Sequence, residues 1–368
     1  MTFALAVLAL FGTLLLTVQA LLTRRFRRAA LPRVFWRRPM ISILKPVCGL
    51  DDELEQNLLS FTRLEGMRYE VIISAEEWTD PALAIVRRVL RDHPDAPFRI
   101  VVDGGSHSGV VNRKVERLIA AANAARGEIF FISDSNVRVE REDLARTIDA
   151  FANPRTGCVS NVFTGAGARS LGATIESLHL LSFVAPGAVL ANSARVPCVV
   201  GKSMAISRRV HDAIGGFARF RRVLAEDQAI GIAVKEAGFE VVLSPIVVRN
   251  VVVDRTLRRA VDRQIRWNKI RYSFSHALYV SELLLNPLPF ALVSPGIFAC
   301  VLLARYLQLA ILNRALQAGL TWKQLALTPL LDALMLYAWL VPFFSKEVTW
   351  RGYRARIGRN TEMIEVAA

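Results

Sequence analysis

An uncharged apolar run near the N-terminus is the feature that most constrains this chain. Residues 3–22 carry no charged side chain, and about 20 helical residues rise about 30 Å, the thickness of a bilayer's hydrocarbon core. Four arginines follow the run, whereas a cleaved signal peptide carries its basic residues before it. The segment Val18-Gln19-Ala20 resembles a cleavage site and leaves that alternative open. The order of charges favours a retained anchor, with its N-terminus outside and the rest of the chain in the cytosol.

Two further apolar stretches lie near the C-terminus. The first runs from about Leu283 to Ala304 without a charge, and its three prolines predict a kinked helix or a short interfacial helix that leads into a span. The second, at about 325–344, contains Asp332, an acid that is expected to face protein or a polar cavity rather than lipid. The amphipathic stretch 270–285 is predicted to lie at the membrane surface. We therefore expect about two C-terminal transmembrane helices.

The charge of the chain agrees with membrane association. The formal net charge is +15, and basic residues flank the apolar stretches at 24–38, 255–271 and 351–359. Such flanks are typical of cytosolic loops, whereas a nucleic-acid-binding protein would show a basic stripe interleaved with aromatic residues, which this sequence does not have. With 53% hydrophobic and 21% charged residues, the composition fits one soluble domain and a few spans.

Between the spans, short apolar strands alternate with helices. Strands are predicted at 41–44, 69–74, 98–102 and 128–133, and helices at 51–64, 81–91, 114–125 and 228–237. This alternation with short connectors predicts an α/β domain with a doubly wound, mostly parallel sheet. Because ligands of such sheets bind beyond the carboxyl ends of the strands, the residues that follow the strands are the candidates for a site.

Polar residues follow these strands. Lys45 follows the first strand, Glu77 and Asp80 the second, and Asp134 with Asn136 the fourth. An acid at such a place is often only the cap of the next helix, and for Asp80 that interpretation is about as favoured as a functional one. Asp134 ends an apolar strand and precedes two small polar residues, which suits a carboxylate that holds Mg²⁺ or Mn²⁺ against a diphosphate.

Two more motifs lie later in the chain. Glu226-Asp227 opens a helix, where an acidic pair on its own is best explained by compensation of the helix dipole. Arg263-Gln264-Ile265-Arg266-Trp267 lies ahead of the C-terminal apolar stretches, and on its own it is best explained as an interfacial anchor. The two motifs become informative through their order after Asp134.

Taken in order, these motifs resemble those of the ceramide glucosyltransferase family from Ile41 to the basic tail. The matching segments are Leu44-Lys45-Pro46 with Gly49, Asp80-Pro81-Ala82, Asn112 with Lys114, Asp134-Ser135, Arg138-Val139, Val200-Gly201 with Ser203, Ala225-Glu226-Asp227, Arg263-Gln264-Ile265-Arg266-Trp267 with Lys269, and Trp350-Arg351. The resemblance implies the nucleotide-sugar-binding α/β fold called GT-A. Together with the apolar runs, it predicts an anchor at 1–24, a cytosolic GT-A domain at 25–275 and an interfacial and transmembrane region at 276–368.

The resemblance also implies which residues bind the donor and its cation. The residues expected near the nucleotide sugar are Lys45, either Glu77 or Asp80, Asn112, Lys114, Asp134, Arg263 and Gln264. The sequence leaves open which of the two acids, Glu77 or Asp80, contacts the nucleoside. Asp134 is expected to bind the divalent cation, and Asn136 occupies the second place of the D-x-D pattern.

The same resemblance implies the residues that carry out the reaction. Asp227 is the expected catalytic base, with Glu226 beside it. Arg266 and Trp267 are expected to hold the diphosphate leaving group and the acceptor end of the site. Relatives of the ceramide type tend to carry a histidine at about 183–185, where this chain has none.

The implied reaction is inverting transfer of a single sugar to the hydroxyl of a membrane lipid. UDP-glucose is the expected donor, with UDP-glucuronate or UDP-galactose as alternatives. Ceramide is the expected acceptor, with a hopanoid or another lipid as the runner-up. A processive polysaccharide synthase shares the last motif but needs more C-terminal helices, and a non-enzymatic receptor is disfavoured because the acids are present. The enzyme is expected in a bacterial inner membrane, with its site facing the cytoplasm and no nucleic-acid partner.

Overall fold

The computed structural model describes residues 2–29, 39–105, 109–350 and 353–365, and the chain forms two compact units. The sheet unit comprises Ala29–Phe163 and Ala191–Val251, and the helical unit comprises Met1–Arg28, Thr164–Leu190 and Val252–Ala368. Parts of the predicted basic flanks at 24–38 and 351–359, and with them Arg351 of the tail motif, lie outside the described residues. The division by sequence at 24 and 275 stays a prediction.

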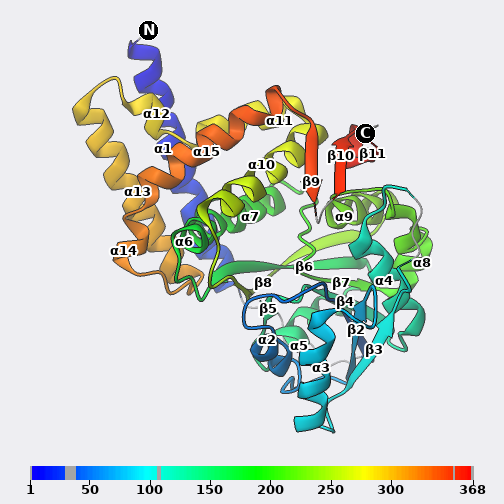
Figure 1. Cartoon of the computed structure of the whole chain (residues 1–368). Coiled ribbons are helices and arrows are strands. Elements are labelled where there is room, and N and C mark those ends of the chain that lie inside the picture. Colours follow the sequence, from blue (N-terminus) through cyan, green and yellow to red (C-terminus); the bar gives the residue numbers. More distant parts are fainter. Residues whose placement is uncertain (1, 30–38, 106–108, 351–352, 366–368) are drawn as a thin grey trace. The chain divides into compact units, whose positions relative to one another are not determined.

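An eight-stranded mixed sheet forms the centre of the sheet unit (Figure 1). Its strands are β1 (Ile41–Pro46), β2 (Tyr69–Ala75), β3 (Phe98–Val102), β4 (Ile129–Ser133), β5 (Val137–Arg138), β6 (Thr156–Ala166), β7 (Ser203–Ser207) and β8 (Glu240–Val251), in the order β3-β2-β1-β4-β7-β6-β8-β5. The end of β6 from Thr164 onward belongs to the helical unit. The four predicted strands are all present, and their bounds agree closely with the sequence-based ones.

The sheet is parallel only in its first half. Strands β3, β2, β1 and β4 pair in parallel, but β7 pairs antiparallel with both β4 and β6, and β5 pairs antiparallel with β8. The prediction of a mostly parallel sheet therefore needs correction for the second half. The sequence pattern showed the crossover helices that parallel strands require, but it carried no signal for the pairing of β7, because its partner β4 lies about 70 residues earlier in the chain.

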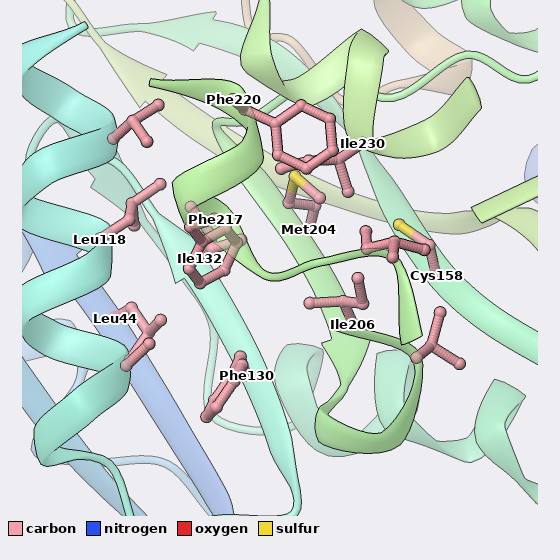
Figure 2. Packing of buried hydrophobic residues seen from close by; sticks show 14 of the residues in the cluster. Leu44, Leu118, Phe130, Ile132, Cys158, Met204, Ile206, Phe217, Phe220 and Ile230 are labelled. Carbon is pink, nitrogen blue, oxygen red and sulfur yellow. The ribbon is translucent and has the colours of Figure 1, made fainter. Parts of the chain in front are cut away.

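Six helices of the sheet unit connect its strands and pack against the sheet. They are α2 (Leu54–Ser60), α3 (Pro81–Asp92), α4 (Arg113–Ala124), α5 (Asp143–Ile148), α8 (Arg208–Ala213) and α9 (Glu226–Glu236). Helix α4 packs against β1 and β2 through its apolar face. Figure 2 shows how Leu118 of α4 shares one cluster with Phe130 and Ile132 of β4 and with Met204 and Ile206 of β7. Full burial of such a side chain contributes about 1.5–3 kcal/mol, so this cluster fixes the strand ends that carry the polar residues.

Among the described residues, three helices are long and apolar enough to cross a membrane: Thr2–Arg28 (α1), Leu171–Ser193 and Pro295–Ala315 (α13). The helix at 171–193 is made of α6 (Leu171–His179), a π-helical turn (Leu180–Val184) and α7 (Ala185–Ser193). It was not predicted, and 78% of its apolar window is buried inside the protein, against 28% for each of the other two. Length and composition thus group it with the spans, whereas its burial is that of a core helix.

The C-terminal apolar stretches differ in length from their predicted bounds. The prolines divide the first into a 3-10 turn (Glu282–Leu285), a short helix α12 (Leu288–Ala291) and α13, which begins at Pro295 and continues to Ala315. The second forms an apolar helix over Thr328–Phe343, only about 24 Å long at about 1.5 Å per residue. This is shorter than a bilayer core of about 30 Å, so the span predicted at 325–344 is corrected to a shorter helix.

The remaining elements of the helical unit are short except for one helix. They are α10 (Leu257–Phe274), α11 (His276–Ser281), α14 (Trp322–Leu325), α15 (Thr328–Leu340), and a three-stranded antiparallel sheet of β9 (Glu347–Trp350), β10 (Tyr353–Ile357) and β11 (Met363–Glu365). Helix α10 carries the whole Arg263–Trp267 motif.

Asp332 confirms the expectation that its carboxylate faces protein. It accepts two hydrogen bonds from the guanidinium of Arg305, from Nε at 3.0 Å and from Nη2 at 2.7 Å, and both side chains are buried. A two-point pair of this kind compensates both charges inside an apolar environment.

We expect Asp332→Ala to lower the free energy of unfolding by about 3–5 kcal/mol, because it leaves the buried guanidinium of Arg305 unpaired. Chemical unfolding in detergent measures this loss. The double variant Asp332→Leu with Arg305→Met is the control, since it removes both charges and should recover most of the stability. A single variant as stable as the wild type would show that the pair contributes nothing.

Candidate active site

Three lysines and three acids gather at the carboxyl ends of β1 and β4 in the sheet unit. Lys45, near the end of β1, is fully buried and donates through Nζ to the backbone carbonyl of Asp134 at 2.8 Å. Its ammonium also lies 4.0 Å above the ring of Phe61. Burial lowers the pKa of Lys45 to about 7, although the nearby charge of Asp134 acts in the opposite direction.

The carboxylate of Asp134 lies between two ammonium groups. Lys114 Nζ is 2.9 Å from Oδ1, and Lys202 Nζ is 3.1 Å from Oδ2. Lys202 also donates to Oδ1 of Asn136 at 3.0 Å. Burial alone would raise the pKa of Asp134, but the two lysines outweigh it and hold that pKa well below the ordinary value. Asp134 therefore stays ionised at any pH at which the protein works.

Lys202 was not predicted from the sequence. It directly precedes β7, whose Ser203 pairs with Ser133 at the end of β4. This register places Lys202 beside Asp134, and the backbone N–H of Asp134 donates to the carbonyl of Lys202 at 3.3 Å. The only local signal was the neighbouring Val200-Gly201 segment, because the pairing of β4 with β7 is visible only in the folded chain.

Glu226 and Asp227 begin α9 and complete the cluster. Glu226 is buried and accepts from Lys114 Nζ at 2.9 Å and from Nδ2 of Asn112 at 3.0 Å. Lys114 thus links Glu226 to Asp134. Burial would lower the pKa of Lys114, but Asp134 and Glu226 raise it above its ordinary value, so Lys114 stays charged.

Asp227 differs from the other two acids because backbone amides hold its carboxylate. Oδ2 accepts from the N–H of Gly201 at 2.6 Å, and Oδ1 accepts from the N–H of Gln228 at 2.8 Å. Burial and the negative charge of Glu226 raise the pKa of Asp227 to about 6, against the opposing effects of Lys114 and the two amides. A fixed carboxylate with a pKa near neutrality is suited to general-base catalysis. Dipole compensation alone, the explanation favoured by the bare sequence, would not require these contacts.

Asn112 supports the cluster from the start of α4. It is fully buried, and its Oδ1 caps α4 by accepting from the N–H groups of Lys114 and Val115. Its Nδ2 donates to Glu226 and to the carbonyl of Val223 at 2.8 Å. These contacts position Lys114 and Glu226, while the predicted contact of Asn112 with the donor stays a prediction.

Gly201 lies so close to Lys114 and Asp227 that a side chain added there would have to displace one of them. A Cβ added there would lie 2.9 Å from Lys114 Nζ and 3.1 Å from Asp227 Cβ. We expect Gly201→Ala to displace the Asp227 carboxylate and to lower kcat by about 10²-fold, since misplacing a reacting group by about 1 Å costs that much. Steady-state kinetics measure the loss. Gly187→Ala is the matched control because a Cβ there meets no atom within 4 Å.

The two candidates for the first acidic position have different surroundings. Asp80 caps α3 by accepting from the N–H of Ala82 at 2.8 Å, and it also accepts from the N–H of Gly49 at 3.0 and 3.2 Å. Gly49 has a φ of 68°, a conformation that favours glycine. Glu77 is exposed and accepts from the hydroxyl of Thr79 at 3.2 Å. Capping thus explains Asp80 structurally, and which acid contacts a nucleoside stays a prediction.

The oxygens of Asp134 and Asn136 fit a divalent cation. Lys202 Nζ contacts Asp134 Oδ2 and Asn136 Oδ1 together, so these two oxygens converge on one cationic group. Carboxylate and amide oxygens suit Mg²⁺ and Mn²⁺. Among the described residues, no group of three or more His, Cys, Asp or Glu side chains is placed to hold a metal ion. Other oxygens, such as those of a diphosphate, would have to complete the coordination.

The arginine–tryptophan motif lies on α10 in the helical unit. The guanidinium of Arg263 forms an ion pair with the buried carboxylate of Glu176 and lies 4.5 Å from the ring centroid of Trp267. Gln264 is buried, and neither polar atom of its side chain has a hydrogen-bond partner among the described residues. Arg266 is partly exposed. Arg263 thus holds the motif in place, and the donor and acceptor roles of the motif stay predictions.

One histidine, His179, lies four residues before Phe183, near the segment 183–185 in which this chain has no histidine. His179 is buried one helical turn before Phe183, and the two rings stack with centroids 5.3 Å apart. The His179 ring also lies 6.1 Å from that of Trp267. His179 was not predicted from the sequence, because the π-helical turn and the packing of α6 on α10 are not visible there.

A small cavity of about 50 Å³ lies among the helices of the helical unit. Its polar lining consists of His179, Ser182, Asn268, Arg271, Glu282, Asn286 and the Arg305–Asp332 pair. Leucine, methionine, phenylalanine and tryptophan side chains supply the rest. Asn268 and Arg271 come from α10, directly after the Arg263–Trp267 motif. The cavity therefore offers hydrogen-bonding groups within an apolar surround.

A mixed α/β sheet with acids and lysines at its strand ends is the architecture of a GT-A glycosyltransferase. The chain is similar to a solved mannosyltransferase from Pyrobaculum calidifontis in complex with GDP-mannose and Mn²⁺, with a TM-score of 0.54 and 19% identity over 92% of this chain and 99% of that one. This likeness confirms the predicted fold class. The chain also matches glycosyl transferase family 21 over residues 3–363, and it belongs to that family.

Curated relatives agree with this assignment. The chain is 26% identical to ceramide glucosyltransferase 1 of Caenorhabditis elegans over 247 residues, which cover 66% of this chain and 52% of that protein. It is 34% identical to a ceramide glucosyltransferase of Komagataella phaffii over 113 residues, which cover 30% of this chain and 22% of that protein. The chain thus spans about half the length of the first of these relatives. The predicted family resemblance is confirmed.

Proposed function

We propose that this family 21 glycosyltransferase transfers a single glucose from UDP-glucose to the hydroxyl of a ceramide-like membrane lipid, with inversion at the anomeric carbon. The observation that carries the proposal is the linked set Asp134, Lys114, Glu226 and Asp227 at the carboxyl ends of the parallel strands. It supplies cationic groups for a diphosphate and a carboxylate for a hydroxyl proton.

Donor binding follows from the charges of the cluster. The ammonium groups of Lys114 and Lys202 contact the carboxylate of Asp134, where a diphosphate would find two positive charges, and Lys45 donates to the backbone carbonyl of the same residue. Asp134 and Asn136 are the proposed protein ligands of Mg²⁺ or Mn²⁺. When bound, that cation would stabilise the negative charge that develops on the leaving diphosphate. The mannosyltransferase of similar fold, solved with GDP-mannose and Mn²⁺, supports this assignment.

The reaction requires one base. Asp227 would accept the proton of the acceptor hydroxyl while its oxygen forms a bond to the anomeric carbon. The bond between that carbon and the diphosphate oxygen breaks, and UDP leaves with the electron pair. Direct attack opposite the leaving group inverts the anomeric configuration. Arg266 and Trp267 are the proposed contacts of the diphosphate and of the acceptor end.

The pH dependence of the rate tests the assignment of the base. A general base works only when deprotonated, so protonation of Asp227 below its pKa of about 6 removes activity. We expect kcat/KM to be constant just above pH 7 and to fall about tenfold for each pH unit below about 6. An acidic limb with a midpoint near 4, the ordinary range of a carboxylate, would exclude Asp227 as the base.

A lipid acceptor is supported by the helical unit. Its apolar helices are long enough to cross a membrane, and the curated relatives are named as ceramide glucosyltransferases. With basic flanks on the cytosolic side, we propose a bacterial inner-membrane enzyme whose 25–275 domain faces the cytoplasm.

A transfer assay with the purified protein tests this proposal. It combines labelled UDP-glucose, UDP-glucuronate or UDP-galactose with ceramide or hopanoid acceptors. The expected result is one product band, glucosylated ceramide, that depends on Mn²⁺ or Mg²⁺. Transfer only to a hopanoid would change the acceptor assignment. A ladder of products would indicate a polymer synthase, and no transfer with any pair would contradict the proposal.

A further inference from the structure

Lys202 occupies the place at which the proposed cation would bind. Its Nζ lies 3.1 Å from Asp134 Oδ2 and 3.0 Å from Asn136 Oδ1, the two oxygens assigned to the metal. Metal–oxygen distances in such sites are about 2.0–2.6 Å, so an ammonium and a metal ion cannot sit between these oxygens together.

The position of Lys202 is set by the fold. The residue directly precedes β7, and the pairing of Ser203 with Ser133 places it next to Asp134. A backbone hydrogen bond joins Asp134 to Lys202, and the Lys202 side chain is only 12% exposed. Its contact with the acids is therefore part of the built site and does not resemble the chance pairing of a surface lysine.

The second oxygen of Asp134 is also engaged. Oδ1 is 2.9 Å from Lys114 Nζ, so both oxygens of this carboxylate contact an ammonium group. The two lysines differ in what else they bind. Lys114 has a second carboxylate partner in Glu226 at 2.9 Å, whereas the other side-chain partner of Lys202 within the described residues is the neutral amide of Asn136. Lys202 is thus the less tightly compensated cation and the one that a metal ion would displace.

We propose that Lys202 is a built-in counter-ion of the cation site: it bridges Asp134 and Asn136 when no donor is bound and leaves them when a divalent cation arrives with a diphosphate. A metal ion alone would have to displace an ammonium whose ion-pair partner among the described residues is Asp134 itself. A metal ion that arrives with a diphosphate brings a second anion with it. Cation and donor therefore bind synergistically, and Lys202 acts as a positioning residue that sets their order. The inference rests on the proposed function for the identity of the diphosphate.

Binding of Mn²⁺ alone to the full-length protein in detergent tests the proposal, with free Mn²⁺ measured by electron paramagnetic resonance. We expect Lys202→Met to bind Mn²⁺ at least about 10-fold more tightly than the wild type, which lies within the usual range of coupling between two sites. Lys235→Met is the matched control. Lys235 belongs to the same unit but donates to the backbone carbonyl of Arg195 at an exposed site, so its loss should leave Mn²⁺ affinity unchanged.

The second part of the binding experiment adds UDP. UDP should tighten Mn²⁺ binding by at least about 10-fold in the wild type and by much less in Lys202→Met, because the ammonium that UDP would attract is gone. Adding Asp134→Asn to Lys202→Met should abolish the tighter binding of Mn²⁺. Lys202→Gln, which keeps a polar side chain of similar length, covers the case in which the methionine variant does not fold.

Equal Mn²⁺ affinities in the wild type and in folded Lys202 variants would overturn the inference. This outcome is distinguishable from failure of the proposed function, because the assay contains no sugar donor or acceptor. Sugar transfer with unchanged Mn²⁺ affinity would refute the role of Lys202 alone. Tighter Mn²⁺ binding in a protein that transfers no sugar would refute the proposed function alone.

Discussion

Asp227→Asn is expected to lower kcat by about 10²–10⁴-fold, the usual contribution of a general base. The amide has nearly the same shape as the carboxylate, but it has no basic oxygen to accept the proton of the acceptor hydroxyl. Its remaining oxygen can still accept one of the two hydrogen bonds from Gly201 and Gln228, so we expect a folded protein. Initial rates at saturating donor, together with UDP binding measured by calorimetry, separate the chemical step from donor binding.

A matched control for this variant lies at the other end of the same helix. Glu236 closes α9 and is exposed, so Glu236→Gln removes one carboxylate without touching the cluster. It should retain the wild-type rate. If Asp227→Asn turned over within about threefold of the wild type, another group would have to be the base.

Asp134→Asn is expected to lower kcat/KM by about 10²–10³-fold and to remove the response to Mn²⁺. The change takes away the carboxylate that compensates Lys114 and Lys202 and that is proposed to bind the cation. Electrostatic stabilisation of a leaving group by one such element is commonly worth this factor. Rates measured over a range of Mn²⁺ concentrations, with and without chelator, show both effects.

An exposed acid of the same unit serves as the control for this second variant. Asp95 lies in the loop before β3, so Asp95→Asn changes the net charge by the same amount at a distance from the cluster. It should keep both the rate and the metal response. An Asp134→Asn enzyme that still responds to Mn²⁺ as the wild type does would show that the cation binds elsewhere.

The parts of the fold that the sequence predicted are those with local signals. The strands β1 to β4 are short apolar runs, and Asp80 with Pro81 is a typical helix start, so each could be placed within a few residues. The antiparallel half could not be predicted, because β7 finds β4 across a long segment of chain. Lys202 was missed for the same reason.

The membrane-related helices illustrate a second limit. Apolar composition correctly predicted α1, but it does not distinguish a lipid-facing helix from a buried one, and the helix at 171–193 is mostly buried. For Asp332, the sequence predicted only that the carboxylate faces protein or a polar cavity rather than lipid. Its partner Arg305 lies 27 residues away on another helix, which periodicity cannot reveal.

The sequence predicted which residues belong to the candidate site better than it predicted their surroundings. Asp134, Lys114, Glu226 and Asp227 lie together because the strand and helix termini that carry them meet at one edge of the sheet, and their roles stay predictions. Sequence could not decide between capping and function for Asp80, since one carboxylate can serve both. The burial that raises the pKa of Asp227 is likewise a tertiary property and has no sequence signature.

Proton NMR of the lipid product is the most direct test of the central claim. Full-length protein, UDP-glucose with its α-linked sugar, Mn²⁺ and a short-chain ceramide should yield one sugar per lipid in the β configuration, and Asp227→Asn should yield none at matched protein concentration. A product with retained α configuration, or with several sugars per lipid, would contradict the account.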